Sequence, residues 1–269
     1  IRKQAAGTWC RWLDGRSPSV ATGTTWGMPW ARGKHRANTQ FALRDSEGIT
    51  VPLQSWPIAY WPDGSLKWTA HAVAAGTQTN SDLLEVVPSR NVPKPTTVLT
   101  AKQTDALIEV DTGVIVCRVP RSGNTVIESI QRAGRATLQA GKLVLVRQDA
   151  PIEDAESSAC EATVKLETFT GEVEHAELEH SGPLRAVIKI TGRHGQCGGR
   201  QWLPFTLRLY FYAGGENVRV MHTFVFDGDE SRDFIRGIGL RFDAPLADPM
   251  HDRHIRFANE GGGIFGEAV

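Results

Sequence analysis

The sequence predicts an all-β protein of two domains, on three observations. Helical periodicity is scarce, whereas short runs of alternating or β-branched residues recur along the chain. Gly, Pro, Asn and Asp bound these runs, as expected of strands joined by turns. One Pro-rich polar stretch, residues 86–104, interrupts the pattern and is typical of an exposed linker. We therefore expect two β-rich parts, 1–95 and 96–269, folded as barrels or sandwiches.

The first part begins with a segment that resembles a loop. Residues 23–38, "GTTWGMPWARGKHRAN", are broken by Gly and Pro and are basic, which favours a surface loop that leads into a strand. Asp63 and Gly64 in "WPDGSLKW" supply the backbone conformations of a tight hairpin turn. The strand-like runs here are 39–45, 49–56 and 65–74.

The second part carries most of the predicted strands. The phrase "YAGGEN" predicts a hairpin turn between Phe211 and Val218. We expect a small sheet first and a larger antiparallel sandwich from about residue 160 onward. The runs are 106–120, 125–134, 142–149, 162–171, 184–194, 205–214, 217–228 and 235–246.

Charge is balanced overall but not locally. The 269 residues include 30 Lys and Arg against 30 Asp and Glu, so net charge indicates no particular partner. The first 36 residues, however, contain seven Lys or Arg and a single acid, Asp14. Such an end attracts anions over a Debye length of ~8–10 Å. With no basic helix and no nucleic-acid-binding motif, a nucleic-acid partner is not predicted.

The sequence predicts neither a metal nor another cofactor, and no membrane span. The four cysteines lie far apart, which argues against a zinc site; free buried thiols are favoured over the three possible disulfide pairings. No apolar run approaches the ~18 residues that a spanning helix needs. Phosphate-loop, dinucleotide and zincin motifs are absent. The chain starts at Ile1 without a signal peptide, so secretion stays open.

The basic segment after residue 23 is the first candidate site. Aromatic faces stack on sugars, and Arg pairs bidentately with carboxylates. An acidic sugar is therefore the ligand that these side chains favour. Alternatively, the two indoles cover one end of a barrel. The candidates for substrate binding are Trp26, Trp30, Arg32, Lys34 and Arg36, with His35 as a candidate base.

The phrase "YWPDGSLKWTAHA" is the second candidate. Tyr60 and His71 are side chains that proton-abstracting enzymes use, and Lys67 is a candidate for substrate binding. Strand alternation predicts that Trp68 faces the core and that Lys67 and His71 lie together on the opposite face. The alternative is an ordinary polar surface.

Acidic residues gather between positions 226 and 239. The spacing does not fit an EF-hand loop, and nothing fixes the ~5–9.5 Å separation of paired glycosidase carboxylates. We favour an acidic turn paired with Arg232 or Arg236, and Arg236 is a further candidate for substrate binding. His251 and His254 are expected in an exposed polar segment rather than at a metal. The acids are Asp227, Asp229, Glu230 and Asp233.

Several separated phrases together resemble the N-terminal part of the exo-rhamnogalacturonan lyase-like family of polysaccharide lyases. They are "GTTWGMPWARGK", "VPLQSWPIAYWPDGSLKWTAHAV", "SGPLRAVIKITGRH", "FTLRLYFYAGGENVRVMHTFVFDGDE" and "RHIRFANEGGG". The resemblance implies a small RIFT-type β-barrel, then a β-sandwich, then a further C-terminal domain beyond Val269. It also implies a secreted or periplasmic enzyme that acts on rhamnose- and uronate-containing polymers, ulvan among them.

The reaction that this resemblance implies is β-elimination at a uronic acid. A cation neutralises the carboxylate, a base removes the C5 proton, and an acid protonates the leaving oxygen. The resemblance assigns no catalytic residue. By residue type, Arg32, Lys34 or Arg36 would hold the carboxylate. His35, Tyr60 or His71 would be the base. The alternatives are a non-catalytic carbohydrate-binding or architectural module and a glycoside hydrolase that uses the acids at 227–233.

Overall fold

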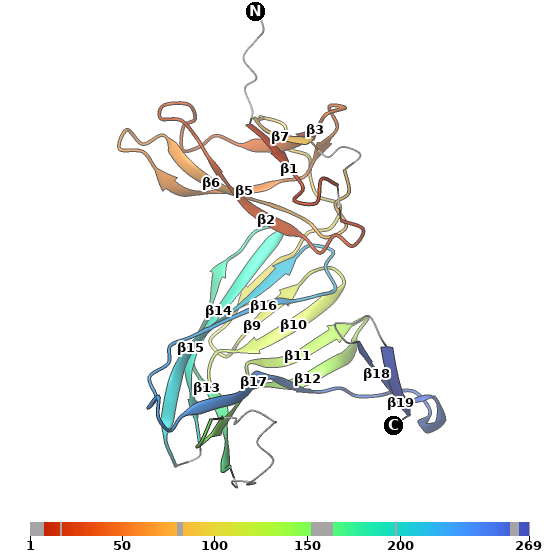
Figure 1. Ribbon diagram of the computed structural model, residues 1–269. Coiled ribbons are helices and arrows are strands. Elements are labelled where there is room, and N and C mark those ends of the chain that lie inside the picture. Colours follow the sequence, from red (N-terminus) through yellow and green to blue (C-terminus); the bar gives the residue numbers. More distant parts are fainter. Residues whose placement is uncertain are drawn as a thin grey trace, which may run out of the picture.

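The structure is a computed structural model that describes residues 8–16, 18–79, 83–151, 164–196, 198–258 and 264–268. Among these residues every regular element is a β-strand except one 3₁₀ turn, η1 (Met250–Asp252). The predicted all-β class is therefore confirmed. Figure 1 shows a small barrel above a larger sandwich, and the hairpin of β18 (His254–Ala258) and β19 (Ile264–Ala268) beside the sandwich.

The barrel consists of two antiparallel sheets that enclose one core. The first has the order β1-β7-β3-β4 and the second the order β2-β6-β5. Large apolar side chains from both sheets meet between them, among them Trp30, Phe41, Leu43, Leu66 and Val86. The strands are β1 (Thr8–Arg11), β2 (Thr24–Pro29), β3 (Phe41–Asp45), β4 (Thr50–Val51), β5 (Gln54–Tyr60), β6 (Leu66–Val73) and β7 (Leu83–Pro88).

Two expectations for the barrel were wrong. Residues 24–29 are not a loop but strand β2, which pairs along its whole length with residues 68–73 of β6. Trp68 is not in the core but 40% exposed on the outer face of β6. The physical reason is an irregularity in the pairing of β5 with β6, where Ala59 pairs with Trp68 but Tyr60 pairs with Leu66, so that Leu66 lies in the core and Trp68 does not. On the neighbouring strand, Gly27 has no side chain, and a Cβ there would be 3.6 Å from the Trp68 ring. The indole therefore lies over a bare stretch of backbone.

The sandwich is one ten-stranded antiparallel sheet, in which nine strands follow the order β16-β15-β14-β13-β12-β11-β10-β9-β8 and β17 pairs with β12. No strand forms in the fully described segment 89–99, which joins it to the barrel. The boundary between residues 95 and 96 stays a prediction. The strands are β8 (Thr100–Gln103), β9 (Leu107–Asp111), β10 (Ile115–Pro120), β11 (Ile127–Arg132), β12 (Arg135–Gln148), β13 (Leu166–His180), β14 (Arg185–Gly195), β15 (Gln201–Tyr212), β16 (Arg219–Phe224) and β17 (Phe234–Asp243).

The long strand β12 makes the sandwich continuous. Its residues 135–141 pair with β11, and its residues 144–148 pair with β13. Ala140, near the end of the first stretch, has φ 48°, a conformation that non-glycine residues seldom adopt, and lies where the pairing of β12 with β17 shifts register between Gln139 and Lys142. The core draws on both halves, for example Ile108 and Cys117 from one and Ile188 and Leu209 from the other. The expected small sheet before residue 160 is therefore part of the same sheet path as the later strands.

Two of the four cysteines are described, and both carry free thiols, as expected. Cys117 is buried, and burial raises the pKa of its thiol to about 12. Cys10 is half-buried, and burial raises its pKa as well. Cys160 and Cys197 lie outside the described residues.

The two domains are joined by hydrogen bonds from the side chain of Gln54 on β5. Its Oε1 accepts from the backbone N–H groups of Leu184 (2.8 Å) and Arg185 (2.9 Å), and its Nε2 donates to the Arg185 carbonyl (3.3 Å). Nearby, the hydroxyls of Thr25 and Tyr212 are 2.9 Å apart. The start of β14 is thus bound to the barrel through its backbone.

We expect Gln54→Ala to lower the free energy of unfolding by about 2 kcal/mol, because two backbone donors lose their acceptor. Urea denaturation monitored by tryptophan fluorescence measures the change. Gln78→Ala, at an exposed position, is the matched control and should change stability by less than about 0.5 kcal/mol. Equal stability of Gln54→Ala and the control would contradict the coupling.

Candidate functional site

The barrel core contains a chain of hydrogen bonds through two of the predicted site residues. Trp30 donates from Nε1 to Thr69 Oγ1 at 2.8 Å, and that hydroxyl lies 2.6 Å from His71 Nε2. The other ring nitrogen, Nδ1, is 2.8 Å from Ser55 Oγ. Because the Thr69 hydroxyl accepts from Trp30, its own proton is free to go to Nε2, and His71 then donates from Nδ1 to Ser55. The neutral imidazole satisfies every partner.

His71 is therefore placed as a structural residue. Its side chain is 0% exposed, and burial lowers its pKa from 6.5 to about 4. Trp30 is buried as well and stacks on Phe41, with ring centroids 5.0 Å apart. A glycan cannot reach either ring, so the structure contradicts His71 as an accessible base and Trp30 as a stacking platform. In a barrel this small, large side chains that point inward from the strands fill the interior.

His35 and Trp26 also point inward. His35 packs edge-on against Trp30 (4.5 Å) and Phe41 (5.3 Å), and burial, then the charge of Lys34, lowers its pKa. Trp26 is half-buried against the barrel core. It borders a pocket of about 440 Å³ with mostly apolar walls, including Trp12 and Leu84. The predicted site residues Trp30, His35 and His71 are thus brought together in the core rather than on a surface, with Trp26 packed against it.

The cations of the same segment point outward. Arg32 pairs with Asp63 across the hairpin turn at 3.1 Å, and Arg36 is exposed. Lys34 lies 5.5 Å from the centre of the Trp30 ring. They form an exposed basic rim, separate from the buried indoles. Whether this rim binds substrate stays a prediction.

Two further predicted residues lie on neighbouring strands of the barrel. Tyr60 is 51% exposed at the end of β5, opposite Leu66. Lys67 follows Leu66 on β6 and lies over the Trp61 ring at 4.8 Å. Both are accessible, and their roles stay predictions.

The acidic turn after β16 is a centre of ion pairs, but with partners other than those expected. Asp233 accepts from Arg147 Nε (2.5 Å) and from both Nη atoms of Arg200 (2.7 and 2.8 Å). Asp227 pairs with Arg193 at 3.1 Å. Arg236 is instead exposed on β17. Hydrogen bonds, first from Arg200, hold the pKa of Asp233 well below its ordinary range. A carboxylate held ionised in this way is unsuited to act as a general acid.

The domain junction brings together a cluster that the sequence prediction missed. Arg185, at the start of β14, is 8% exposed, and its guanidinium lies 5.0 Å from the Trp56 ring and 5.3 Å from the Tyr210 ring. Its Nη1 is 3.3 Å from His180 Nδ1. We call Trp56, His180, Arg185 and Tyr210 the junction cluster. Its members come from β5, β13, β14 and β15. They are spread over residues 56–210 of the sequence, so no local motif predicts the cluster.

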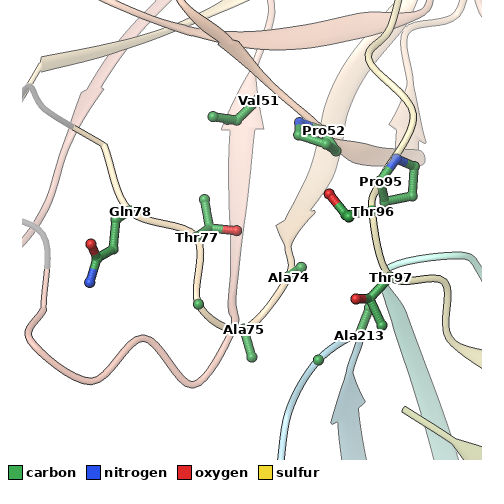
Figure 2. A pocket seen from close by; sticks show the side chains of 12 residues that line it. Val51, Pro52, Ala74, Ala75, Thr77, Gln78, Pro95, Thr96, Thr97 and Ala213 are labelled. Carbon is green, nitrogen blue, oxygen red and sulfur yellow. The ribbon is translucent and has the colours of Figure 1, made fainter. Parts of the chain in front are cut away.

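A pocket of about 300 Å³ opens at another part of the junction (Figure 2). Figure 2 shows the prolines Pro52 and Pro95 and small side chains such as Thr96 around it. Its walls carry no charged side chain, so it offers no cation to a carboxylate. In the described part of the chain, three or more His, Cys, Asp or Glu side chains nowhere gather as metal ligands would. Nor does that part hold a helix long and apolar enough to cross a bilayer.

Models of known protein families match both domains. The model of the PcRGLX-like N-terminal RIFT barrel domain matches residues 7–88, and that of the PcRGLX-like central β-sandwich domain matches residues 99–269. The chain belongs to the PcRGLX-like family. This is the exo-rhamnogalacturonan lyase-like family that the sequence resembles, and the predicted succession of RIFT barrel and sandwich is confirmed.

One curated relative aligns with nearly the whole chain. It is YetA, an uncharacterized protein of Bacillus subtilis (strain 168), which is 39% identical over 253 residues. The alignment covers 94% of this chain but 29% of YetA, so the chain spans less than a third of the length of that relative.

The similarity to solved structures is weak. An α-mannosidase from Enterococcus faecalis gives a TM-score of 0.43 at 9% identity, over 78% of this chain and 28% of its own. A glycosyl hydrolase family 38 protein from the same species gives 0.39 at 8% identity, over 78% and 30%.

Proposed function

We propose that this chain forms part of a polysaccharide lyase that cleaves an acidic, rhamnose- and uronate-containing polysaccharide by β-elimination. The observation that supports the proposal is that PcRGLX-like domain models match both of its domains, over residues 7–88 and 99–269. A polymer of this kind is extracellular material, which is consistent with secretion or export to the periplasm.

The chemistry needs a cation near the uronate carboxylate and a base near C5. Among the residues predicted for these roles, the exposed ones remain in the proposal. Tyr60 is the accessible candidate for the base, and Arg32, Lys34, Arg36 and Lys67 are the accessible cations of the barrel. Arg236 is an accessible cation on the sandwich.

The second candidate function is a carbohydrate-binding or supporting module of such an enzyme. The burial of His35 and His71 favours it, because two of the three candidate bases are fixed in the barrel core. The two functions differ in one product. A lyase raises the ultraviolet absorbance of unsaturated uronate when it is mixed with rhamnogalacturonan or ulvan. A binding module gives a binding isotherm with the same polymers and no rise in absorbance.

If the chain itself is catalytic, we expect Tyr60→Phe to lower the rate of unsaturated product formation by about 10²-fold or more, the usual contribution of a general base. The tyrosine is exposed, so its hydroxyl can be removed without opening the core. Tyr212→Phe is the control, since it removes a phenolic hydroxyl that lies beside Thr25 in the junction. Full activity of Tyr60→Phe would exclude Tyr60 as the base.

A further inference from the structure

Arg185 in the junction cluster is a buried cation without a carboxylate of its own. It forms no ion pair with any described side chain, and its Nε is buried without a hydrogen-bond partner. Glu179, on the neighbouring strand, is paired with Arg208 instead, which donates hydrogen bonds to both of its carboxylate oxygens at 2.8–3.1 Å. A buried charge is costly unless it is paired. The rings of Trp56 and Tyr210 offset part of that cost through cation–π contacts.

The surroundings of Arg185 are cationic. Arg208 and Arg219 are on the same outer face of the sheet, and the Arg219 guanidinium is 5.7 Å from the other ring neighbour of Arg185, Tyr210. Lys189 is on this face too, paired with Glu177 at 3.4 Å. This face has four cations and two carboxylates. The cations are Arg185, Lys189, Arg208 and Arg219, and the carboxylates are Glu177 and Glu179. The face therefore attracts anions.

An exposed indole continues this face onto the barrel. Trp56 is opposite Ala70 on β6, so Trp68 is the diagonal neighbour of Trp56 on the outer side of the sheet. Diagonal neighbours in an antiparallel pair are roughly 7–8 Å apart. Trp68 is 40% exposed and lies over Gly27. A flat apolar surface is thus available within reach of a short oligosaccharide that contacts Arg185.

We propose that Arg185 binds the carboxylate of a uronic acid residue, at a site formed by both domains, and that Trp68 stacks on a flanking sugar. Trp56 and Tyr210 hold the guanidinium plane in place, and His180 limits its rotation. Arg219, which is exposed beside Tyr210, supplies a second cation. This inference rests on the proposed action on an acidic polymer, and it places the recognition of the acid at the domain junction.

Binding of trigalacturonate and of its carboxyl-reduced counterpart, measured by titration calorimetry on the 269-residue chain, tests the site. We expect Arg185→Lys to weaken trigalacturonate binding about ten- to a hundredfold, because lysine keeps the charge but loses the two-pronged contact. Arg219→Gln should weaken it less and reduce its salt dependence. Trp68→Ala should weaken binding of the acidic and the reduced oligosaccharide alike.

The matched control is Arg132→Gln, which removes an exposed arginine from the sandwich, where it pairs with Glu216. It should bind as the parental chain does. Equal affinity of Arg185→Lys and the parental chain, or no binding of trigalacturonate by the parental chain, would overturn the proposed site. If Arg185→Lys does not fold, unchanged affinity and salt dependence of Arg219→Gln together with unchanged affinity of Trp68→Ala would overturn it. The absorbance assay for unsaturated product tests the proposed function separately.

Discussion

Replacing Asp233 by asparagine is expected to lower the free energy of unfolding by about 2–4 kcal/mol. This is somewhat less than for a fully buried ion pair, because the Arg200 side chain is 43% exposed and Arg147 keeps its pair with Glu167. The carboxylate is 4% exposed and accepts hydrogen bonds from two guanidinium groups, those of Arg147 and Arg200. It also accepts from the backbone N–H of Asp229 at 2.7 Å. Without the negative charge, two cations face each other across a partly buried site.

The substitution should also weaken contacts outside the ion pairs, because the turn is packed onto the end of the sandwich. Gly228 lies so close to Trp202 that a Cβ there would be 2.8 Å from the indole. Trp202 is buried with Phe169 and Leu145 in a small cluster of its own. Arg200 also lies over this indole, 4.5 Å from the ring centre. Asp233 thus fixes the arginine that covers the cluster.

Chemical denaturation at neutral pH measures the change, and Glu230→Gln is the control. Glu230 lies in the same turn and is exposed, so its replacement should change stability by no more than about 0.5 kcal/mol. The pKa of Asp233 is lowered in the folded protein, so its contribution is present above the unfolded pKa and is lost as the pH falls through the folded value. Similar losses for the two variants would show that the network contributes little.

Strand pattern predicts most of the sandwich because its strands are long and bury alternate residues. Strand β10 alternates between buried and half-buried positions along its whole length, although the predicted run 106–120 did not separate it from β9. Strand β2 was missed because Gly27 and Pro29 interrupt a short segment whose pairing with β6 is a tertiary property. The crossing of β12 between β11 and β13 also depends on contacts that no local window contains.

The sequence predicted less of the candidate site than of the fold. Residue type alone selected His71 and Trp30, yet both are satisfied within the core by Thr69. Alternation predicted Trp68 in the core and His71 on the opposite face, whereas the structure has His71 inside the barrel and Trp68 outside it. Alternation does not say which face is inside the barrel. Arg185 carried no local signal, because its aromatic neighbours Trp56 and Tyr210 come from strands 129 positions before it and 25 after it.

Acidification should destabilise the barrel through His71. The pKa of this buried imidazole is lowered from 6.5 to about 4, so the unfolded chain binds a proton in this range more readily than the folded one. Stability is therefore unaffected by this group above about pH 6.5 and falls as the pH drops from there towards 4. At 1.36 kcal/mol for each pKa unit, the loss from His71 reaches about 3 kcal/mol.

The variant His71→Gln separates this contribution from that of other titrating groups. Glutamine does not titrate, so the variant should be less stable at pH 7 but should lose about 3 kcal/mol less than the parental protein between pH 7 and pH 4. Urea denaturation at a series of pH values gives both numbers. His175→Gln, at an exposed position on β13, is the control and should keep the parental pH dependence.

The same experiment decides between two roles for His71. As a structural residue it accepts a hydrogen bond from the Thr69 hydroxyl at Nε2 and donates one from Nδ1 to Ser55, and only the neutral ring makes both. Protonation would turn Nε2 into a donor and leave the Thr69 hydroxyl proton without its acceptor. An accessible base would instead titrate in contact with solvent and would impose no such cost on folding. Parental and His71→Gln proteins with parallel pH profiles would therefore contradict the structural role.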